Sequence, residues 1–446
     1  MNHGQNYPEH LTILDRHLTQ ALEIAGRNGL HLEGVIFHAG RLAVYHADDL
    51  LVTFRAHGHF RRWTPMPGPE HVVLARPGQK PRVIRVQPQD YWYDTSPPPT
   101  SYWESSVDLE QVGNFAEVKE RLGSLDGIAF VGGCAEAAEE LGIPAERVEP
   151  AELMAPLDWY RAYKTPHELD CLRLASASAA AGHRRAREVF ELGASERQIH
   201  WAYLEASNQM EHEVPYETIV AFDRKAATLH YQHKRGAEAA PGNVFLLDAG
   251  AAHDGYAADI TRTWFQSSVD EVFQALVRGV DAFERDLVAM VTPGRPYLEI
   301  HVEAHRRTAN LLHELGIFTC APEEAFDQGL THPFLPHGIG HQLGIQVHDV
   351  GGHQAGPEGG QVPPPEQYPF LRNTRLLEPG HVVTIEPGIY FIPMLLDPVR
   401  SSEQGKSVNW DLVDHLTPLG GVRIEDDVVC TEEEPEDFTR GLIEGP

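Results

Sequence analysis

Two aspartates on either side of a predicted turn are the first residues whose types and spacing could do chemistry. Asp248 ends an apolar run over 244–247, and Asp259 lies in a second run that ends at Phe265. An apolar run, a glycine-containing turn and a β-branched return are typical of a β-hairpin. If residues 252–255 form a four-residue loop, Asp248 lies directly opposite Asp259.

Two carboxylates opposed across a hairpin destabilise it, because like charges then face each other at short range. A divalent cation, or a pair of cations about 3.5–4 Å apart, would hold both carboxylates. The alternative is that both aspartates are solvated turn residues, which is the commoner outcome for such a pair. The choice depends on whether the rest of the chain supplies further ligands.

Three later stretches supply candidate ligands. The first, PHGIGHQLGIQVHDVGGH, contains His337, His341 and His348. Two glycines separate the first two histidines, and no glutamate follows His337, so a helical zinc motif is disfavoured. The spacing indicates instead a loop or strand that brings imidazoles to one site. The alternative is a run of hydrogen-bonded core histidines.

The second and third stretches each place a carboxylate in or at the end of an apolar strand. HVVTIEPGIYF predicts a strand over Val382–Ile385 with Glu386 at its end, and GGVRIEDDVV places Arg423 and Glu425 on one strand face. Burying a carboxylate without a partner is costly. For both stretches the alternative to a ligand is a buried ion pair or an edge-strand charge.

Taken together, these stretches offer one imidazole and four carboxylates, a hard and oxygen-rich set. Such a set suits Mn²⁺ or Co²⁺ better than a structural zinc ion. Two cations that share bridging carboxylates would lower the pKa of a bridging water and supply hydroxide near neutral pH. The candidate ligands in chain order are Asp248, Asp259, His341, Glu386 and Glu425.

This order resembles the dinuclear metallopeptidases of the pita-bread fold, which include methionine aminopeptidase. Within them the chain is most similar to the bacterial Xaa-Pro dipeptidases (prolidases) and the closely similar organophosphorus acid anhydrolases. The similarity extends over essentially the whole chain. It is densest at LLDAGAAHDGYAADITRTW, LPHGIGHQLGIQVHDVGG, VVTIEPGIYF and GGVRIEDDVV.

The resemblance implies a role for each ligand around two divalent ions, with Mn²⁺ as the first choice. Asp248 would chelate one metal, and Asp259 and Glu425 would bridge both. His341 and Glu386 would complete the other site. Glu386 would also be the proton shuttle for the bridging hydroxide.

The resemblance also implies which residues surround the substrate. His230, His337 and His348 would bind the substrate backbone and stabilise the tetrahedral intermediate. Arg423, with Arg372 as a second candidate, would hold the C-terminal carboxylate of a dipeptide through a bidentate contact, which would exclude longer chains. Tyr216 would hydrogen-bond near the metals.

The expected activity is hydrolysis of Xaa-Pro dipeptides with release of proline, by a homodimer. One alternative keeps the dinuclear site but acts on organophosphate triesters. Another is a non-catalytic pita-bread binding module; such proteins lose ligands, so this alternative and a metal-free creatinase-like enzyme are disfavoured. The chain has His57-Gly58 where bacterial members of the family more often have Asn-Pro. In the family this region approaches the partner's active site, so the substrate preference could differ.

Composition excludes some partners. The 446 residues include 36 basic and 65 acidic ones, and the resulting formal charge of −29 argues against nucleic acid and anionic membranes. No apolar run approaches the length of a membrane span, and no basic-then-apolar segment opens the chain. Four cysteines without a Cys-x-x-Cys pair favour a reducing compartment. We therefore expect a cytoplasmic protein.

The elements that must position these residues form two predicted domains. Residues 1–160 alternate strands and helices, which predicts an α/β domain. Residues 161–446 begin with two helices and continue with strand-like segments, which predicts the α+β pita-bread domain. In the first domain we expect helices over 7–28, 109–122 and Ala135–Leu141 and strands over 34–39, 50–54, 71–75, 81–86 and 128–132. In the second we expect helices over 166–192, 195–210, 269–291 and 297–315.

Overall fold

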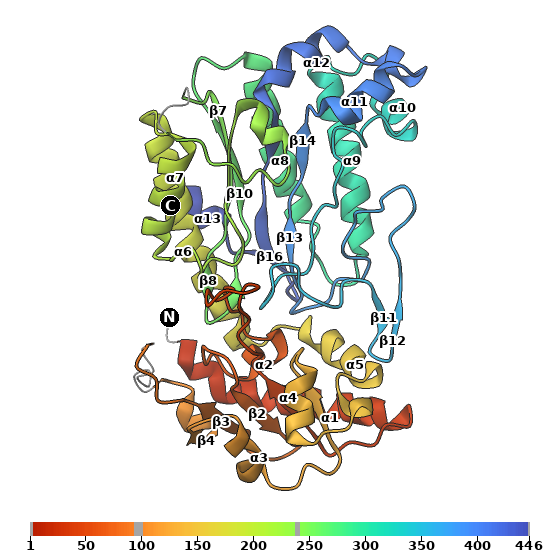
Figure 1. The fold of residues 1–446 in the computed structure, drawn as a ribbon. Helices are drawn as coiled ribbons and strands as arrows, with labels where there is room; N and C mark the ends of the chain where they lie inside the picture. The colour runs from red at the N-terminus through yellow and green to blue at the C-terminus, as the bar shows by residue number, and fades with distance from the viewer. Residues whose placement is uncertain (1–2, 93–100, 237–240, 445–446) are drawn as a thin grey trace. The chain divides into compact units, whose positions relative to one another are not determined.

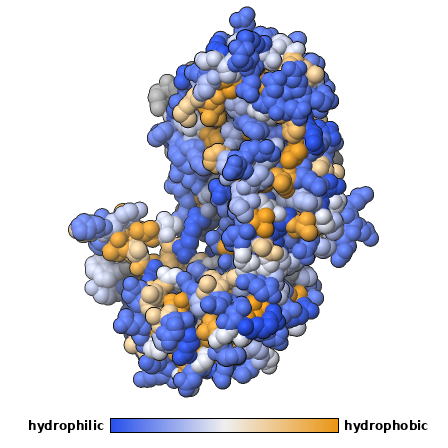
Figure 2. Space-filling model, turned by 90° about the vertical axis from the view of Figure 1, so that its right-hand side faces the viewer, coloured by the Kyte–Doolittle hydropathy of each residue, from blue (hydrophilic) through white to orange (hydrophobic). Residues whose placement is uncertain are grey.

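The structure is a computed structural model of the chain and describes residues 3–92, 101–236 and 241–444. The chain divides into two compact units (Figure 1). The first contains the residues up to 171 together with 354–360, and the second contains 172–353 and the residues from 361 onward. Over the face that Figure 2 shows, hydrophilic residues predominate and apolar ones form small scattered patches.

The first unit is built on a mixed five-stranded sheet in the order β4-β3-β2-β1-β5. The outer pairs β3/β4 and β1/β5 are parallel, and β1/β2 and β2/β3 are antiparallel. The strands are β1 (Gly34–His38), β2 (Val72–Ala75), β3 (Arg82–Val86), β4 (Asp108–Val112) and β5 (Ile128–Val131).

Alternate residues of these strands face two different layers of helices. Val35 and Phe37 pack with α1 (Tyr7–Arg27) on one face. On the other face Ile36 packs with α3 (Ala116–Leu122) and α4 (Ala135–Leu141). The predicted α/β domain is confirmed.

Two predicted elements of the first unit are wrong. The predicted helix over 109–122 is a strand followed by a helix, because β4 pairs in register with β3 and Gly113 separates it from α3. The predicted strand over 50–54 has only one isolated bridge, between Leu51 and Val44. Leu50 and Val52 are exposed there, so no neighbouring strand covers them.

The second unit carries the predicted helices and strands. The first helix begins at a capping box formed by Thr165 and Glu168: the Thr165 amide donates to Glu168 Oε2 (2.8 Å), and the Glu168 amide donates to Thr165 Oγ1 (3.2 Å). A second capping box opens the next helix. The long helices are α6 (Pro166–Glu191), α7 (Glu196–Ser207), α8 (Glu271–Val288) and α9 (Tyr297–Glu314).

Short sheets join in the centre of this unit. The strand orders are β10-β7-β6, β13-β16-β17 and β14-β15. An isolated bridge between Thr261 and Glu425 connects the first sheet to the segment between β15 and β16. The strands are β6 (Ile219–Phe222), β7 (Val244–Asp248), β10 (Thr261–Phe265), β13 (Val382–Ile385), β14 (Gly388–Tyr390), β15 (Gly421–Arg423), β16 (Asp426–Val429) and β17 (Glu436–Asp437).

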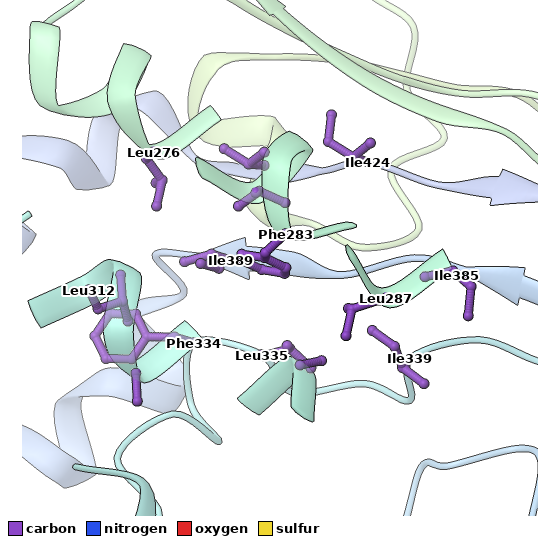
Figure 3. Close-up of a cluster of buried hydrophobic side chains, with 14 of the residues drawn as sticks. Leu276, Phe283, Leu287, Leu312, Phe334, Leu335, Ile339, Ile385, Ile389 and Ile424 are labelled. Carbon is purple, nitrogen blue, oxygen red and sulfur yellow. The ribbon is translucent and has the colours of Figure 1, made fainter. Parts of the chain in front are cut away.

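Helices cover the central strands with apolar side chains. α6 and α7 pack on β6 and β7. α8 and α9 contribute Leu276, Phe283 and Leu312 to the same buried cluster as Ile385 of β13 and Ile389 of β14, and Phe283 lies beside Ile389 (Figure 3). The predicted α+β organisation is confirmed. The remaining elements are α2 (Gly58–Trp63), α5 (Ala151–Arg161), α10 (Pro322–Asp327), α11 (Pro393–Arg400), α12 (Trp410–Leu416), α13 (Arg440–Glu444), β8 (Ala252–His253), β9 (Tyr256–Ala257), β11 (Gln354–Gly356) and β12 (Gly359–Gln361).

The hairpin that carries the two aspartates has a different register from the predicted one. Ala252 and His253 pair with Ala257 and Tyr256, which leaves a two-residue loop. Both loop residues have positive φ (Asp254 48°, Gly255 92°), as a type I′ turn requires.

This shorter loop shifts the pairing by two residues. Asp248 therefore lies opposite Thr261 and not opposite Asp259. Because the shift is even, Asp259 keeps the same face as Asp248 and becomes its diagonal neighbour.

Among the described residues, no helix has the length and apolar composition that a membrane span requires.

Candidate metal centre

Three potential ligands from separate segments converge in the second unit. Asp259 lies between β9 and β10, His341 follows Gly340, and Glu425 lies between β15 and β16. One ligand atom from each lies within 4.8 Å of the other two, and all three residues are buried. His341 Nε2 is 3.4 Å from Asp259 Oδ2. The hairpin and the later strands thus bring the predicted residues to one place.

His341 is aimed by its contacts with strand β13. Its amide donates to Thr384 Oγ1 (3.2 Å), and its carbonyl accepts from the Thr384 amide (3.0 Å). Its ring Nδ1 lies 3.0 Å from the Gln342 carbonyl oxygen, so Nδ1 carries the proton and Nε2 is left to face the carboxylates. Gly340 permits this approach, because at its φ of 150° an added Cβ would lie 2.1 Å from the Thr384 carbonyl oxygen.

Glu425 is fixed by the strand that carries the hairpin. Thr261 Oγ1 donates to Glu425 Oε2 (2.6 Å), and the Glu425 amide donates to the Thr261 carbonyl (3.0 Å). Arg262 Nη1 donates to the Glu425 carbonyl (2.8 Å). Burial, and then the charges of neighbouring carboxylates, raise the pKa of Glu425 well above its usual range.

Asp259 has a partner on each side. Tyr216, a predicted site residue, donates its hydroxyl hydrogen to Asp259 Oδ1 (2.5 Å). The Asp259 amide donates to Asp427 Oδ2 (3.1 Å). The carboxylate is therefore oriented from Tyr216 while its backbone is tied to β16.

Asp248 has one satisfied oxygen and one orphaned oxygen. Its Oδ2 accepts from Arg423 Nη2, whereas its buried Oδ1 has no hydrogen-bond partner among the described residues. Burial raises the pKa of Asp248, although Arg423 opposes the shift. A buried carboxylate oxygen without a donor fits a cation as its partner. The hard donor set around it fits a divalent ion.

Glu386 stands at the end of β13 between two histidines. Its Oε1 is 3.8 Å from His341 Nε2, and its Oε2 is 3.9 Å from His337 Nδ1. Burial raises the pKa of Glu386 to about 7, against the attraction of His341 and Arg423. Its two oxygens thus face two different parts of the site.

A chain of hydrogen bonds links His337 to Asp248. Arg423 Nη1 donates to the Tyr390 hydroxyl (2.9 Å), and this hydroxyl lies 2.9 Å from His337 Nε2. His337 Nδ1 is 2.8 Å from the Gly338 carbonyl oxygen, so Nδ1 carries the proton and Nε2 accepts from Tyr390. Burial lowers the pKa of His337 to about 4, which keeps the ring neutral.

The remaining predicted residues lie at the edge of the centre. The His348 ring packs edge-on against His341, with centroids 4.4 Å apart, and burial lowers the pKa of His348 to about 4. His230 and Arg372 are exposed. Both residues also contribute to lowering the pKa of His348, and His230 contributes in the same way at His337.

Sequence reasoning missed the polar residues that orient the others. Thr261, Thr384 and Tyr390 contact Glu425, His341 and Arg423 respectively. Thr261 had a usable signal, because it lies two residues after Asp259 on the same strand face. Thr384 and Tyr390 had none, because threonine and tyrosine are ordinary in apolar strands.

The fold and this cluster can be compared with known proteins. Residues 170–432 match the model of metallopeptidase family M24, and residues 5–159 match that of the Xaa-Pro dipeptidase N-terminal domain. The chain belongs to metallopeptidase family M24. The candidate centre lies wholly within the part that matches this family.

Curated relatives of this M24 metallopeptidase match it over its full length. It is 40% identical over 442 residues to the Xaa-Pro dipeptidase of Xanthomonas campestris pv. campestris, covering 99% of this chain and 98% of the relative. It is 38% identical over 440 residues to that of Pseudoalteromonas atlantica, covering 98% of each. The resemblance stated from the motifs is confirmed.

Solved structures match the M24 metallopeptidase in fold. Aminopeptidase P from Escherichia coli, solved with the inhibitor Pro-Leu, aligns with a TM-score of 0.70 at 22% identity over 96% of this chain and 95% of that one. Proline aminopeptidase P II from Yersinia pestis gives 0.70 at 23% identity over 97% of each. The predicted pita-bread catalytic domain is confirmed, and the chain is a peptidase and hence a hydrolase.

Proposed function

We propose that this M24 metallopeptidase hydrolyses Xaa-Pro dipeptides and releases proline. Its full-length similarity to bacterial Xaa-Pro dipeptidases supports the substrate class. The observation that carries the proposal is the meeting of Asp259, His341 and Glu425 within 4.8 Å in a buried site.

We propose that two divalent ions occupy this centre, held by Asp248, Asp259, His341, Glu386 and Glu425. When bound, they would supply an activated water and polarise the scissile carbonyl. The orphaned Oδ1 of Asp248 and the oxygen-rich donor set support this assignment. Four carboxylates and one imidazole favour Mn²⁺ over softer ions.

Glu386 is the proposed proton shuttle. It accepts a proton from the attacking water and delivers it to the leaving proline nitrogen. Its position supports this role, because one oxygen faces His341 and the other faces His337.

The substrate would be held by residues with free polar atoms. We propose that His348 and His230 contact the peptide carbonyl and that exposed Arg372 binds the C-terminal carboxylate. Arg423 already donates from Nε to Thr261 (3.1 Å), from Nη1 to Tyr390 and from Nη2 to Asp248. Two of its five N–H groups are left for a substrate, so Arg423 serves the clamp beside Arg372. His337 would reach substrate only after releasing Tyr390.

Proline release tests the proposal directly. Purified protein reconstituted with Mn²⁺ should release proline from Ala-Pro and not from Ala-Pro-Ala. A matched Glu386→Gln variant should bind metal and release proline at least about a hundredfold more slowly. No proline release from any of several Xaa-Pro dipeptides with Mn²⁺, Co²⁺, Zn²⁺ or Fe²⁺ would refute the function.

A homodimer and a cytoplasmic location complete the proposed function. The homodimer follows from the family resemblance, and the cytoplasmic location follows from the composition of the chain. The four cysteines, all in the described part of the chain, are free thiols, as a reducing compartment favours. Light scattering should give twice the 49.7 kDa chain mass. A monomer with full activity would remove the dimer from the proposal.

A further inference from the structure

A second cluster of imidazoles lines a cavity that His337 of the candidate metal centre also lines. His301, His305 and His332 line a cavity of about 290 Å³ in the second unit, together with Tyr368. His301 and His305 are spaced i, i+4 on α9, so both project from one face of that helix. None of these histidines takes part in the proposed chemistry.

The rings are close enough to share one ion. The centroids of His301 and His305 are 4.8 Å apart, and those of His305 and His332 are 4.9 Å apart. Two imidazoles bound to one tetrahedral ion through nitrogens about 2.0–2.1 Å from it have centroids about 5 Å apart. The spacing of the rings therefore matches that of ligands around a single cation.

The free nitrogens of the cluster are also those that a metal needs. His305 Nδ1 lies 2.9 Å from Thr331 Oγ1, so this nitrogen is already engaged and Nε2 is the one available to an ion. Metal-binding histidines commonly fix their second nitrogen in this way. His301 is only 2% exposed, yet its Nδ1 has no hydrogen-bond partner among the described residues.

All three rings are in the protonation state that binds metal. Burial lowers the pKa of His301 to about 3 and that of His305 to about 2, and it also lowers the pKa of His332. Neutral imidazoles are the ligand form, and no proton has to leave before an ion binds.

The ligand nitrogens have not converged as they have in the carboxylate centre. Among the described residues, only Asp259, His341 and Glu425 bring three ligand atoms within 4.8 Å of one another. The His332 ring must therefore turn about χ2, a broad and roughly two-fold torsion for histidine, while His305 keeps its contact with Thr331. His332 is half-buried at the cavity and has room to turn.

We propose that His301, His305 and His332 form a second metal site, distinct from the carboxylate centre, that binds one late first-row ion such as Zn²⁺ or Cu²⁺. Three nitrogen ligands prefer these ions over Mn²⁺, whereas the oxygen-rich centre prefers hard ions. The protein would thus hold one site that prefers late first-row ions and one that prefers hard ions. The fourth position is open to water from the cavity.

The matched test counts zinc ions in four proteins. Wild type, His305→Gln, His332→Gln and the control His313→Gln are loaded with Zn²⁺ and equilibrated against a competing chelator. His313 is an exposed histidine at the end of the same helix. Wild type and the His313 variant should each hold one zinc more than the other two. Equal zinc stoichiometry and affinity in all four would overturn the proposal.

A spectroscopic experiment tests the site without the His305 variant, so its outcome does not depend on whether that variant folds. One equivalent of Cu²⁺ added to Mn²⁺-loaded wild type should give an electron paramagnetic resonance spectrum with nitrogen hyperfine splitting from several imidazoles. The half-buried His332→Gln protein should lose part of that splitting. A spectrum of oxygen-dominated coordination, unchanged in His332→Gln, would show copper only at the carboxylate centre and refute the second site.

Discussion

Two buried charge clusters lie on opposite sides of the Glu425–Asp426 peptide, and they differ in how their charge is balanced. On one side, Asp426 pairs with Arg262 and with Arg440 (2.9 Å), and Arg440 also pairs with Glu284. Two fully buried carboxylates are thus matched by two arginines. Each of the two carboxylates contacts an arginine, although burial and then Asp426 still raise the pKa of Glu284 well above its usual range.

The other side has more carboxylates than cations. Among the described residues, Arg423 is the one arginine that forms an ion pair with a carboxylate of Asp248, Asp259, Glu386 or Glu425. Removing a carboxylate from water without a partner is costly, so the imbalance raises the pKa of Glu386 and Glu425. The comparison teaches that adjacent acids in one strand can serve structure and metal binding, and that the supply of arginines separates the two.

The largest effect is expected from a substitution in the unbalanced cluster. Asp259→Asn removes a carboxylate from the centre of the ligand set, and activity should fall by about a thousandfold or more, because metal assistance supplies several kcal/mol. Proline release and bound metal by mass spectrometry check this. Retention of both metals and of activity would show that Asp259 is not a ligand.

Asp426→Asn changes the balanced cluster, and it should lower the stability of the protein without lowering its metal content. It leaves Arg262 buried without its carboxylate, whereas Arg440 keeps Glu284, so the free energy of unfolding should fall by about 3–5 kcal/mol. The protein that stays folded should keep its full complement of metal. Denaturant titration and metal analysis measure both quantities. Metal loss equal to that of Asp259→Asn would mean that the two clusters act as one.

The pH dependence of stability in the metal-free protein tests the charge imbalance of the carboxylate centre. The pKa of Glu386 is raised from 4.5 to about 7, so the native state binds more protons than the unfolded state between these values. Stability therefore falls as pH rises through this window. In excess chelator, wild type should lose about 3 kcal/mol relative to Glu386→Gln from pH 4.5 to 7.5. Parallel pH profiles of the two proteins would contradict this.

A smaller effect is expected from Thr261, which holds Glu425. Thr261→Val keeps the strand but removes the hydroxyl that donates to Glu425 Oε2 (2.6 Å). Loss of such a supporting contact typically weakens metal binding by about 10–100-fold. Thr263→Val is the control, because the Thr263 hydroxyl bonds to the backbone of Arg423 and not to a carboxylate among the described residues. Equal metal affinities in the two variants would refute the role of Thr261.

Much of the fold could be predicted because local patterns and tertiary contacts agree. The helix beginning at Pro166 has its capping box in the sequence, and β13 is the predicted strand Val382–Ile385. The segment 109–122 failed because pairing of β4 with β3 outweighed its helical spacing. Such pairing depends on a strand more than twenty residues away and leaves no local signal.

For the site, sequence gave the acids but not their geometry. Asp254-Gly255 is a dipeptide typical of a two-residue hairpin turn, and the prediction of a four-residue loop did not use this signal. The engagement of Arg423 by Asp248 and Tyr390 could not be foreseen, because β14, β15 and β7 meet only in the folded chain. Residue types predict a metal centre, whereas the partners of each atom come from the fold.

The smallest effect is expected from a comparison of two tyrosines, one whose hydroxyl donates a hydrogen bond and one whose hydroxyl has no partner among the described residues. Tyr216 donates to Asp259 (2.5 Å), so Tyr216→Phe should lower activity about tenfold, the effect of losing one hydrogen bond to a charged group. Tyr203 is buried, and its hydroxyl has no partner in the described part of the chain. Tyr203→Phe should therefore leave activity unchanged and leave stability equal or higher, because it removes an unsatisfied polar group. Steady-state kinetics and thermal melts of the pair decide this. If both variants lose activity equally, the loss reports disturbed packing and not the hydrogen bond that orients Asp259.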